Sequence, residues 1–262
     1  MGEHRVNIAA IDPVWSRIRD DANALVALEP LMASVAHVSI LNHTSLDQAL
    51  AFRLSSKIKS VEISEELLMR VFTDAYNDEP DIIHSARADL IAFYERDPAC
   101  NKFVQPFLYY KGFQALQCYR VANYLWRVDR KDLAYYIQNR CSEVYSIDIH
   151  PAAKIGKGLM IDHAHSIVIG ETAIVGDNVS MLHSVTLGGT GKNEKDRHPK
   201  VGDGVLIGAG AKVLGNIRIG NCCRIAAGSV VLKDVPKCKT VAGVPARIVG
   251  EAGCDQPSLT MD

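Results

Sequence analysis

The second half of the chain repeats an aliphatic residue every six positions. Counting in sixes from Ile149 gives seven such positions up to Val185, and the count resumes ten residues out of step at Val201 and runs to Val231. Twelve of these thirteen positions are Ile or Val, and the remaining one is Ala173. Helices have an apolar period of about 3.6 residues and half-buried strands of about two. A period of six predicts a coil that turns a corner every six residues and stacks its aliphatic side chains, which is a parallel β-helix of hexapeptide repeats.

The first 147 residues carry helical patterns instead. Asp12-Pro13 reads as a helix N-cap followed by a first-turn proline. The stretch from Phe107 to Trp126 has apolar residues at helical spacing, and Lys131 to Val144 predicts a last helix before the coils. Only Gly2 and Gly112, of 19 glycines, precede residue 148, which suits helices.

These patterns predict an α + β protein with two domains and a tail. We expect an all-helical domain over 1–147 and a β-helix over 148–250. The β-helix carries one inserted loop, 188–200, and a polar tail follows over 251–262. At about 18 residues a coil, the hexads make a little over four coils. Such a short three-sided prism exposes much of its wall, and trimers would cover it.

Composition excludes several function classes. The 29 basic and 30 acidic residues form no long run of one sign, so we expect no nucleic-acid partner and no membrane partner. The first residues lack the basic start and apolar core of a secretory signal. Seven cysteines form no C-x-x-C pair, and we expect reduced thiols in a cytoplasmic protein.

Histidines gather where the coils begin. Five of the nine lie between His150 and His198, and His163 directly follows Asp162. A histidine whose tautomer is held by a carboxylate can serve as a general base, and we expect His163 to do so. The inserted loop, glycine-rich and basic, is the second place where we expect site residues. It lacks the spacing of a nucleotide-binding P-loop, because Thr186 and Asn193 occupy two of the required positions.

Two other chemistries compete with a general base. No G-x-S-x-G motif occurs, and neither Ser229 nor the pair Cys222-Cys223 has a histidine near it in sequence. His165 and His183 lie three hexads apart, which is one predicted coil, so they are expected to stack one above the other. With a histidine from a second prism they could bind zinc, as in carbonic anhydrases built on this β-helix, although the H-x4-H pair of those enzymes is missing. A metal site therefore stays an alternative, and the main expectation is an enzyme without metal.

Several motifs together resemble bacterial serine O-acetyltransferases of the hexapeptide-repeat acyltransferase superfamily. The resemblance covers nearly the whole chain, and it implies that the β-helix is left-handed. The helical half contributes Asp97-Pro-Ala and Tyr110-Lys-Gly-Phe-Gln-Ala-Leu-Gln117. The coils contribute Asp148-Ile-His-Pro-Ala-Ala-Lys-Ile-Gly, Asp162-His163-Ala, Gly170-Glu-Thr-Ala, Ser184-Val-Thr-Leu-Gly-Gly-Thr-Gly-Lys192, Asp196-Arg-His-Pro-Lys200, Ile207-Gly-Ala-Gly-Ala-Lys-Val-Leu-Gly-Asn216 and Ala242-Gly-Val-Pro-Ala-Arg-Ile-Val-Gly250. The helical domain together with Asp162-His163-Ala and Asp196-Arg-His-Pro-Lys200 is more specific than the hexads alone.

This resemblance implies transfer of the acetyl group of acetyl-CoA, a co-substrate, to the hydroxyl of L-serine. The products are O-acetyl-L-serine and CoA, in the first step of cysteine biosynthesis, and L-cysteine is the expected inhibitor. The resemblance makes His163 the general base and Asp148 the carboxylate that orients it. It assigns serine binding to four residues, which are Asp97, Asp162, Arg197 and His198. Two signs of fixed charge suit a zwitterionic substrate, and Arg offers a two-pronged grip on its carboxylate.

The resemblance also places the CoA arm along the coils. Small residues there let the arm approach the backbone, and a cation meets its phosphates. The expected CoA-binding residues are Gly189, Gly208, Ala209, Ala227 and Arg247. The small residues are also explained by packing at the corners of the coils alone. A separate alternative concerns the substrate: the chain could be an acetyltransferase for another hydroxyl acceptor, such as a sugar or an antibiotic.

Quaternary partners follow from the family as well. The resemblance implies a homotrimer or a dimer of trimers, with each site between adjacent prisms. It also implies that the helical domain 1–147 serves oligomerisation and contributes part of the serine site. Many members carry a C-terminal isoleucine that inserts into O-acetylserine sulfhydrylase. The last residue here is Asp262, so either the sequence is cut short or that partner is not bound in this way.

Overall fold

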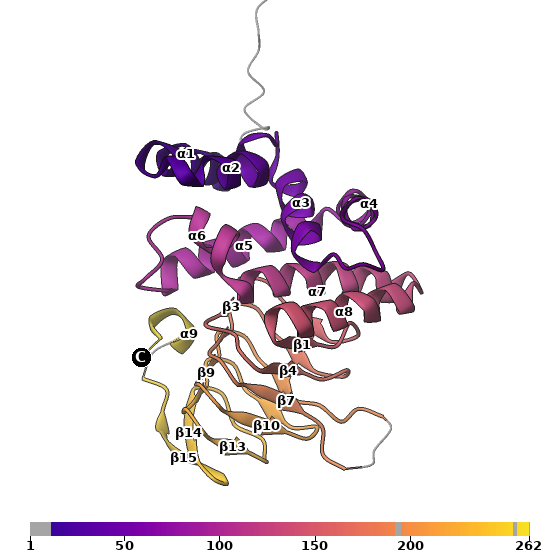
Figure 1. Cartoon of the computed structure of the whole chain (residues 1–262). Helices are drawn as coiled ribbons and strands as arrows, with labels where there is room; N and C mark the ends of the chain where they lie inside the picture. Colours follow the sequence, from indigo (N-terminus) through magenta and orange to yellow (C-terminus); the bar gives the residue numbers. More distant parts are fainter. Residues whose placement is uncertain (1–11, 192–194, 254–255, 262) are drawn as a thin grey trace, which may run out of the picture.

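The chain folds as a stack of helices that continues into a β-helix. The structure is a computed structural model that describes residues 12–191, 195–253 and 256–261. Figure 1 shows the helices at one end of the molecule and the coiled strands at the other. The fold class predicted from the sequence is confirmed. Parts of the predicted loop 188–200 and of the predicted tail 251–262 lie outside the described residues.

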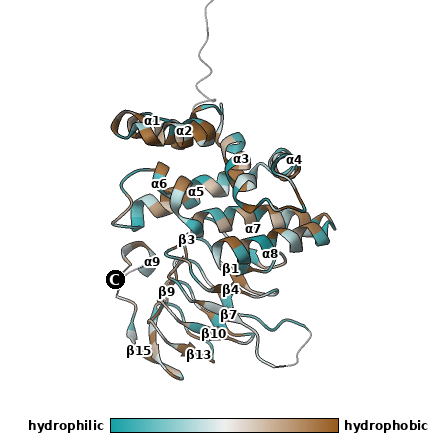
Figure 2. Ribbon diagram, in the orientation of Figure 1, coloured by the Kyte–Doolittle hydropathy of each residue, from teal (hydrophilic) through white to brown (hydrophobic). Residues whose placement is uncertain are grey.

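Amphipathic helices form the first half, and Figure 2 shows hydrophilic and hydrophobic residues along each of the longer ones. The predicted cap at Asp12 is confirmed, because its carboxylate accepts a hydrogen bond from the backbone N–H of Trp15 at 3.1 Å. The helices are α1 (Pro13–Leu28), α2 (Ala33–Ala36), α3 (Leu46–Ile58), α4 (Glu65–Asp78), α5 (Asp81–Arg96), α6 (Val104–Tyr109), α7 (Lys111–Arg127) and α8 (Lys131–Tyr145), with a 3-10 turn over Pro30–Met32 and a π-turn over His37–Leu41.

The predicted helix from Phe107 to Trp126 is wrong at its beginning. Tyr110 has an extended backbone and separates α6 from α7. The reason lies in the packing of α7 on the first coil. A Cβ atom on Gly112 would stand 2.0 Å from the carbonyl oxygen of Ile161, so only glycine lets α7 begin against that strand.

Three sheets make the walls of the β-helix, and all their strand pairs are parallel except the last pair, β14 and β15, which is antiparallel. In order along each wall they are a five-stranded sheet β1-β4-β7-β10-β13, a four-stranded sheet β11-β8-β5-β2 and a six-stranded sheet β15-β14-β12-β9-β6-β3. We call them sheets A, B and C. The strands are β1 (Ile147–Ile149), β2 (Lys154–Ile155), β3 (Met160–Ile161), β4 (Ile167–Ile169), β5 (Ile174–Val175), β6 (Ser180–Met181), β7 (Thr186–Gly188), β8 (Lys200–Val201), β9 (Leu206–Ile207), β10 (Lys212–Leu214), β11 (Arg218–Ile219), β12 (Arg224–Ile225), β13 (Val230–Val231), β14 (Lys239–Gly243) and β15 (Ala246–Glu251). A short helix, α9 (Pro257–Thr260), follows.

The stacked aliphatic positions of the β-helix keep the predicted register only in part. Ile149 pairs with Ile169 and Ile155 pairs with Val175, so the first coil is longer by two residues than the three hexads predicted for it. After Ile161 the strand positions therefore run two residues later than the count in sixes predicted, as Ile169, Val175, Met181 and Leu187. The predicted positions Ile167, Ala173, Val179 and Val185 are all buried, because a second column of side chains also points inward. From Val201 to Val231 the predicted register is confirmed.

A buried ion pair joins the two halves. The carboxylate of Asp89 on α5 is fully buried and accepts hydrogen bonds from Arg120 at 2.7 Å and Gln117 at 2.9 Å, both on α7. Its other oxygen accepts from the backbone N–H of Leu159 in the first coil at 2.9 Å. Removing either charged partner would leave the other charge buried and unpaired. Among the described helices, none is both long and apolar enough to cross a membrane.

Candidate active site

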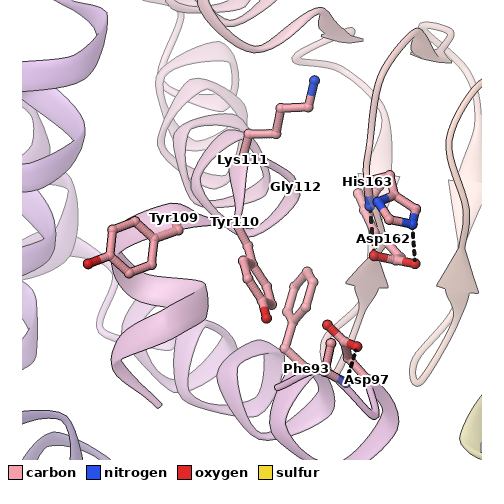
Figure 3. Close-up of a pocket in the computed structure, with 10 residues that line it drawn as sticks. Phe93, Asp97, Tyr109, Tyr110, Lys111, Gly112, Asp162 and His163 are labelled. Atoms are coloured by element: carbon pink, nitrogen blue, oxygen red, sulfur yellow. Dashed lines mark hydrogen bonds and ion pairs between the residues drawn. The ribbon is translucent and has the colours of Figure 1, made fainter. Parts of the chain in front are cut away.

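A cavity of about 460 Å³ lies where the helices meet the first coil. Figure 3 shows Phe93, Asp97 and Tyr110 on one side of it and Asp162 and His163 on the other. Three of the predicted site residues, Asp97, Asp162 and His163, therefore line one pocket, which we call the His163 pocket. Burial, together with the neighbouring Cys100 and Asp97, raises the pKa of Tyr110, so its hydroxyl stays protonated.

The two extra residues of the first coil form the turn that presents His163. His163, Ala164 and Ser166 all have left-handed backbones, with φ between 54° and 60°. The Asp162 carboxylate accepts from the backbone N–H of His163 at 2.8 Å, and its other oxygen lies 3.4 Å from Nε2 of the ring. The His163 side chain is 69% exposed, so its ring is open to a substrate.

The same turn brings a second histidine ring close to His183. The predicted stacking of His165 over His183 holds for the backbone, because the strands after the turn pair 18 residues apart and the N–H of Ser184 donates to the carbonyl oxygen of His165 at 2.6 Å. The ring that contacts His183 is that of His163, with ring centroids 5.7 Å apart in an edge-to-face arrangement. Among the described residues, no group of three or more His, Cys, Asp or Glu side chains is placed to hold a metal ion.

Asp148 lies in a different place from His163. It projects from β1 and accepts a hydrogen bond from Gln138 of α8 at 2.6 Å. With His150 and Tyr135 it lines a separate groove of about 390 Å³ between α8 and sheet A. Within one chain, Asp148 is not among the residues that line the His163 pocket.

Arg197 and His198 are held rigidly at the end of the inserted loop. The hydroxyl of Thr172 accepts from the backbone N–H groups of Arg197 at 3.0 Å and His198 at 3.1 Å. Glu171 accepts from the Arg197 guanidinium at 2.6 Å. The Lys200 ammonium donates to the carbonyl oxygens of Thr172 at 2.8 Å and His198 at 2.7 Å. These contacts fix the direction of both predicted serine-binding side chains.

The protonation state of His198 follows from its surroundings. Nδ1 accepts a hydrogen bond from the backbone N–H of Thr172 at 3.2 Å, so the proton of the neutral ring sits on Nε2. The residue is only 7% exposed, and this burial, followed by the nearby Arg197 charge, lowers the pKa of His198. Burial also lowers the pKa of His150. His198 is therefore a neutral hydrogen-bond donor near pH 7.

Three of the five residues expected to bind CoA form one stripe. Ala209 and Ala227 continue the column of His183 on the next two coils, as the hydrogen bonds from Gly210 N–H to His183 and from Gly228 N–H to Ala209 show. A Cβ atom on Gly208 would stand 2.6 Å from the nitrogen of Ala227. Gly189 lies instead beside Arg197 and His198, and Arg247 is on the β15 hairpin opposite Ala242.

The predicted residues thus occupy the two corners of sheet A. The His163 turn joins sheet C to sheet A, and the column that runs from His165 through His183 to Ala227 stands at this corner. Arg197 and His198 pack on Gly170 and Glu171, where sheet A turns into sheet B. About six residues of extended chain, roughly 20 Å, separate neighbouring corners. Within one chain, neither Arg197 nor His198 is among the residues that line the His163 pocket.

Several supporting residues were not predicted. Thr172, Glu171 and Lys200 orient the loop, and Gln138 orients Asp148. Lys111 and Tyr110 line the His163 pocket. Glu171 and Thr172 lie in the motif Gly170-Glu-Thr-Ala, and Tyr110 and Lys111 lie in Tyr110-Lys-Gly-Phe-Gln-Ala-Leu-Gln117, but these motifs pointed to the family without giving the residues a role. Lys200 lies four residues after Asp196 and binds its carboxylate, lowering the pKa of Asp196.

Comparisons with known proteins identify the family of this chain. A family model described as the N-terminal part of serine acetyltransferase matches residues 14–118, and a bacterial transferase hexapeptide model of six repeats matches residues 198–233. A serine acetyltransferase from Salmonella typhimurium is 51% identical over 252 residues, which cover 96% of this chain and 92% of that protein. The crystal structure of serine acetyltransferase from Vibrio cholerae is 51% identical, with a TM-score of 0.94 over 95% of this chain and 96% of that one.

Related structures contain ligands. A Brucella abortus serine acetyltransferase in complex with coenzyme A is 50% identical, with a TM-score of 0.92 over 95% of this chain and 99% of that one. A serine acetyltransferase in complex with cysteine is 48% identical (TM-score 0.93, 95% and 97% covered). One from Neisseria gonorrhoeae in complex with serine is 50% identical (TM-score 0.87, 92% and 99% covered). The resemblance found in the sequence is confirmed, and the chain belongs to the serine acetyltransferase family.

Proposed function

We propose that this chain transfers the acetyl group of acetyl-CoA to the hydroxyl of L-serine with His163 as the general base. The observation that carries the proposal is the His163 pocket, where an exposed imidazole faces two carboxylates at the end of a stripe of small residues. The family comparisons support the reaction, and the structures that contain coenzyme A and serine support both substrates.

The proposed reaction needs one base and no covalent enzyme intermediate. The His163 imidazole removes the proton of the serine hydroxyl while the oxygen attacks the thioester carbonyl. The tetrahedral intermediate then collapses, the C–S bond breaks, and the imidazolium returns its proton to the CoA sulfur. A positioned base of this kind contributes about 10²–10⁴-fold to the rate.

Fixed charges would hold serine in this position. Asp97 and Asp162 line the His163 pocket and would bind the ammonium group. Arg197 would grip the carboxylate with two N–H groups, and the Nε2 proton of His198 would donate to the carboxylate or the developing oxyanion. The acetyl-CoA arm would follow the stripe of Gly208, Ala209 and Ala227, with Gly189 at the loop and Arg247 as a partner for its phosphates.

The site would be completed by a second copy of the chain. The corner of sheet A with His163 in one copy would meet the corner with Arg197, His198 and Asp148 in the next. Such a contact joins two different surfaces, and it closes into a ring when it repeats around an axis. We propose a trimer, in which Asp148 orients the His163 ring of the neighbouring copy, and a pairing of trimers through the helical half. Leu28 and Leu31, exposed near the end of α1, support that second contact.

The reaction can be followed by the loss of acetyl-CoA thioester absorbance, which protein thiols do not disturb. We expect turnover that depends on L-serine and is blocked by L-cysteine, since cysteine differs from serine in one atom and would bind to the same side chains. Turnover with a sugar hydroxyl and none with serine would contradict the proposal. We keep the cytoplasm as the proposed location.

A mixing experiment tests the shared site separately. His163→Ala and Arg197→Ala variants are each expected to be inactive, but trimers reassembled from both should regain part of the activity. A mixed trimer contains some interfaces where intact His163 faces intact Arg197. Mixtures that stay inactive although both variants exchange subunits would contradict a site between copies.

A further inference from the structure

The corner between sheets B and C carries one left-handed residue in every coil. In chain order these are Gly158, Asn178, Gly204, Cys222 and Cys238, with φ between 56° and 69°. The last four donate their backbone N–H to the coil before, from Asn178 to Lys157, from Gly204 to Asp177, from Cys222 to Asp203 and from Cys238 to Asn221. The five residues therefore form a single column.

Two cysteines in this column are not explained by the backbone. Glycine and asparagine adopt the left-handed conformation readily, whereas other residues adopt it at a cost in free energy. The first three coils use glycine or asparagine at this corner, and the last two use cysteine. A costly conformation that recurs in neighbouring coils points to a role for the side chains.

The strand register places the two cysteines directly beside each other. Ile219 pairs with Val235 and Ile225 pairs with Val241, so Cys222 aligns with Cys238 between them. Neighbouring strands lie about 4.8 Å apart, and disulfides span Cα separations of about 4.4–6.8 Å. Because both backbones have the same conformation, both Cβ atoms leave the corner in the same direction, about 4.8 Å apart. Disulfides have Cβ separations of about 3.5–4.5 Å, so closing the bond would draw these two turns slightly together. Both side chains are partly exposed, and neither is in a disulfide in this structure.

Neighbouring Cys223 differs from Cys222 and Cys238 in its burial. Its side chain is fully buried and donates to the carbonyl oxygen of Pro236 at 3.0 Å, and burial raises the pKa of its thiol. Cys100, Cys118 and Cys141 are buried among the helices. Among the described residues, Cys222 and Cys238 are the two cysteines that are not buried.

We propose that Cys222 and Cys238 are a redox-active pair that closes into a disulfide between the last two coils. A small disulfide such as oxidised glutathione would be the oxidant. One cysteine thiolate attacks the oxidant's S–S bond and releases one glutathione thiol, and the second cysteine then attacks the mixed disulfide and releases the other. The protein loses two electrons and two protons, and the oxidant becomes two molecules of glutathione.

This bond would fasten β14 to β12. It closes a loop of about 16 residues, which reduces the freedom of the unfolded chain, so the melting temperature should rise by roughly 5–10 °C. The corner lies opposite sheet A, away from the catalytic residues. The inference is therefore independent of the proposed reaction, and either can fail alone.

Peptide mapping after oxidation tests the pairing. The full chain is incubated with oxidised glutathione, alkylated and digested with trypsin, which cuts after Arg218, Arg224, Lys237 and Lys239. We expect the peptide 219–224 joined to the dipeptide 238–239, and a Cys223→Ala variant should give the same product, which assigns the bond to Cys222. No such product, or a bond from Cys222 to Cys254 or to a second chain, would overturn the proposal.

Thermal unfolding tests the consequence with matched variants. Oxidation should raise the melting temperature of the wild-type chain and of Cys223→Ala, and dithiothreitol should reverse the rise. Cys222→Ser and Cys238→Ser should melt like the reduced wild type under both conditions. If the oxidised wild-type chain contains the disulfide but melts at the same temperature as the reduced chain, the bond does not stabilise the last coil, and this part of the proposal is contradicted.

Discussion

The β-helix departs from its six-residue period at two places, and the two insertions hold opposite kinds of side chain. The two-residue insertion near His163 leaves an imidazole 69% exposed, and Asp162 is the carboxylate that lies against it. The longer insertion returns the chain at His198, which is 7% exposed and fixed by Thr172 and Lys200. A proton carrier must reach the substrate, whereas a binding group gains from being held in place beforehand.

Replacing His163 tests the exposed side of this comparison and should have the largest effect. His163→Ala should lower kcat by about 10²–10⁴-fold with little change in the KM for serine, because the proton carrier is lost and the binding charges stay. Thioester absorbance gives both constants. His165→Ala is the matched control, since His165 is also exposed in the same turn and should be replaceable within a few-fold. Equal losses in both variants would contradict a special role for His163.

Serine binding at the longer insertion can be weakened by replacing Arg197. Arg197→Lys keeps the charge but loses the planar fork, so the KM for serine should rise about 10–100-fold while the KM for acetyl-CoA stays the same. Steady-state kinetics with each substrate varied in turn measures this difference. Arg218→Lys, an exposed arginine on β11, serves as the control. A parallel rise in both KM values would mean that Arg197 supports the fold of the loop instead of serine binding.

A smaller change removes only the support behind Arg197 and His198. Thr172→Val keeps the shape but takes away the acceptor of two backbone N–H groups, so the loop should loosen and the KM for serine should rise about 5–10-fold. Thr172→Ser retains the hydroxyl and should restore the wild-type value. If serine at this position fails to restore it, then the methyl group and not the hydrogen bonds positions the loop.

The smallest expected effect concerns pH. Burial lowers the pKa of His198 in the folded chain below its value in the unfolded chain. Below about pH 6.5 the imidazole is therefore protonated in the unfolded chain to a greater extent than in the folded chain. The free energy of unfolding should therefore fall as the pH drops from 7.5 to 5.5. His198→Asn has no group that titrates there and should lose less stability, as urea midpoints at both pH values would show. Equal losses in both proteins would remove His198 as a source of the pH dependence.

The hydrophobic pattern predicted the fold because each coil repeats the same burial. It could not locate the two-residue insertion, since Ile167, Ala173, Val179 and Val185 are inward-facing too and keep the count in phase. The break at Tyr110 was also invisible, because its cause is the contact between Gly112 and a strand distant in sequence. The motifs predicted which residues would line a site. They did not predict that Asp148 lies in a groove apart from His163, because that depends on which corner of the prism each residue occupies.

Gly112 has a consequence for how this protein could be rebuilt. The first turn of α7 rests on the carbonyl oxygen of Ile161, the residue before the Asp162-His163 pair, with no room for a methyl group between them. The helical half is therefore not an interchangeable part. A β-helix joined to the helical half of another protein would keep its coils, but it would lose the surface of α7 against which the turn with Asp162 and His163 packs. Chimeras of this fold should be cut elsewhere than at the apparent boundary between helices and strands.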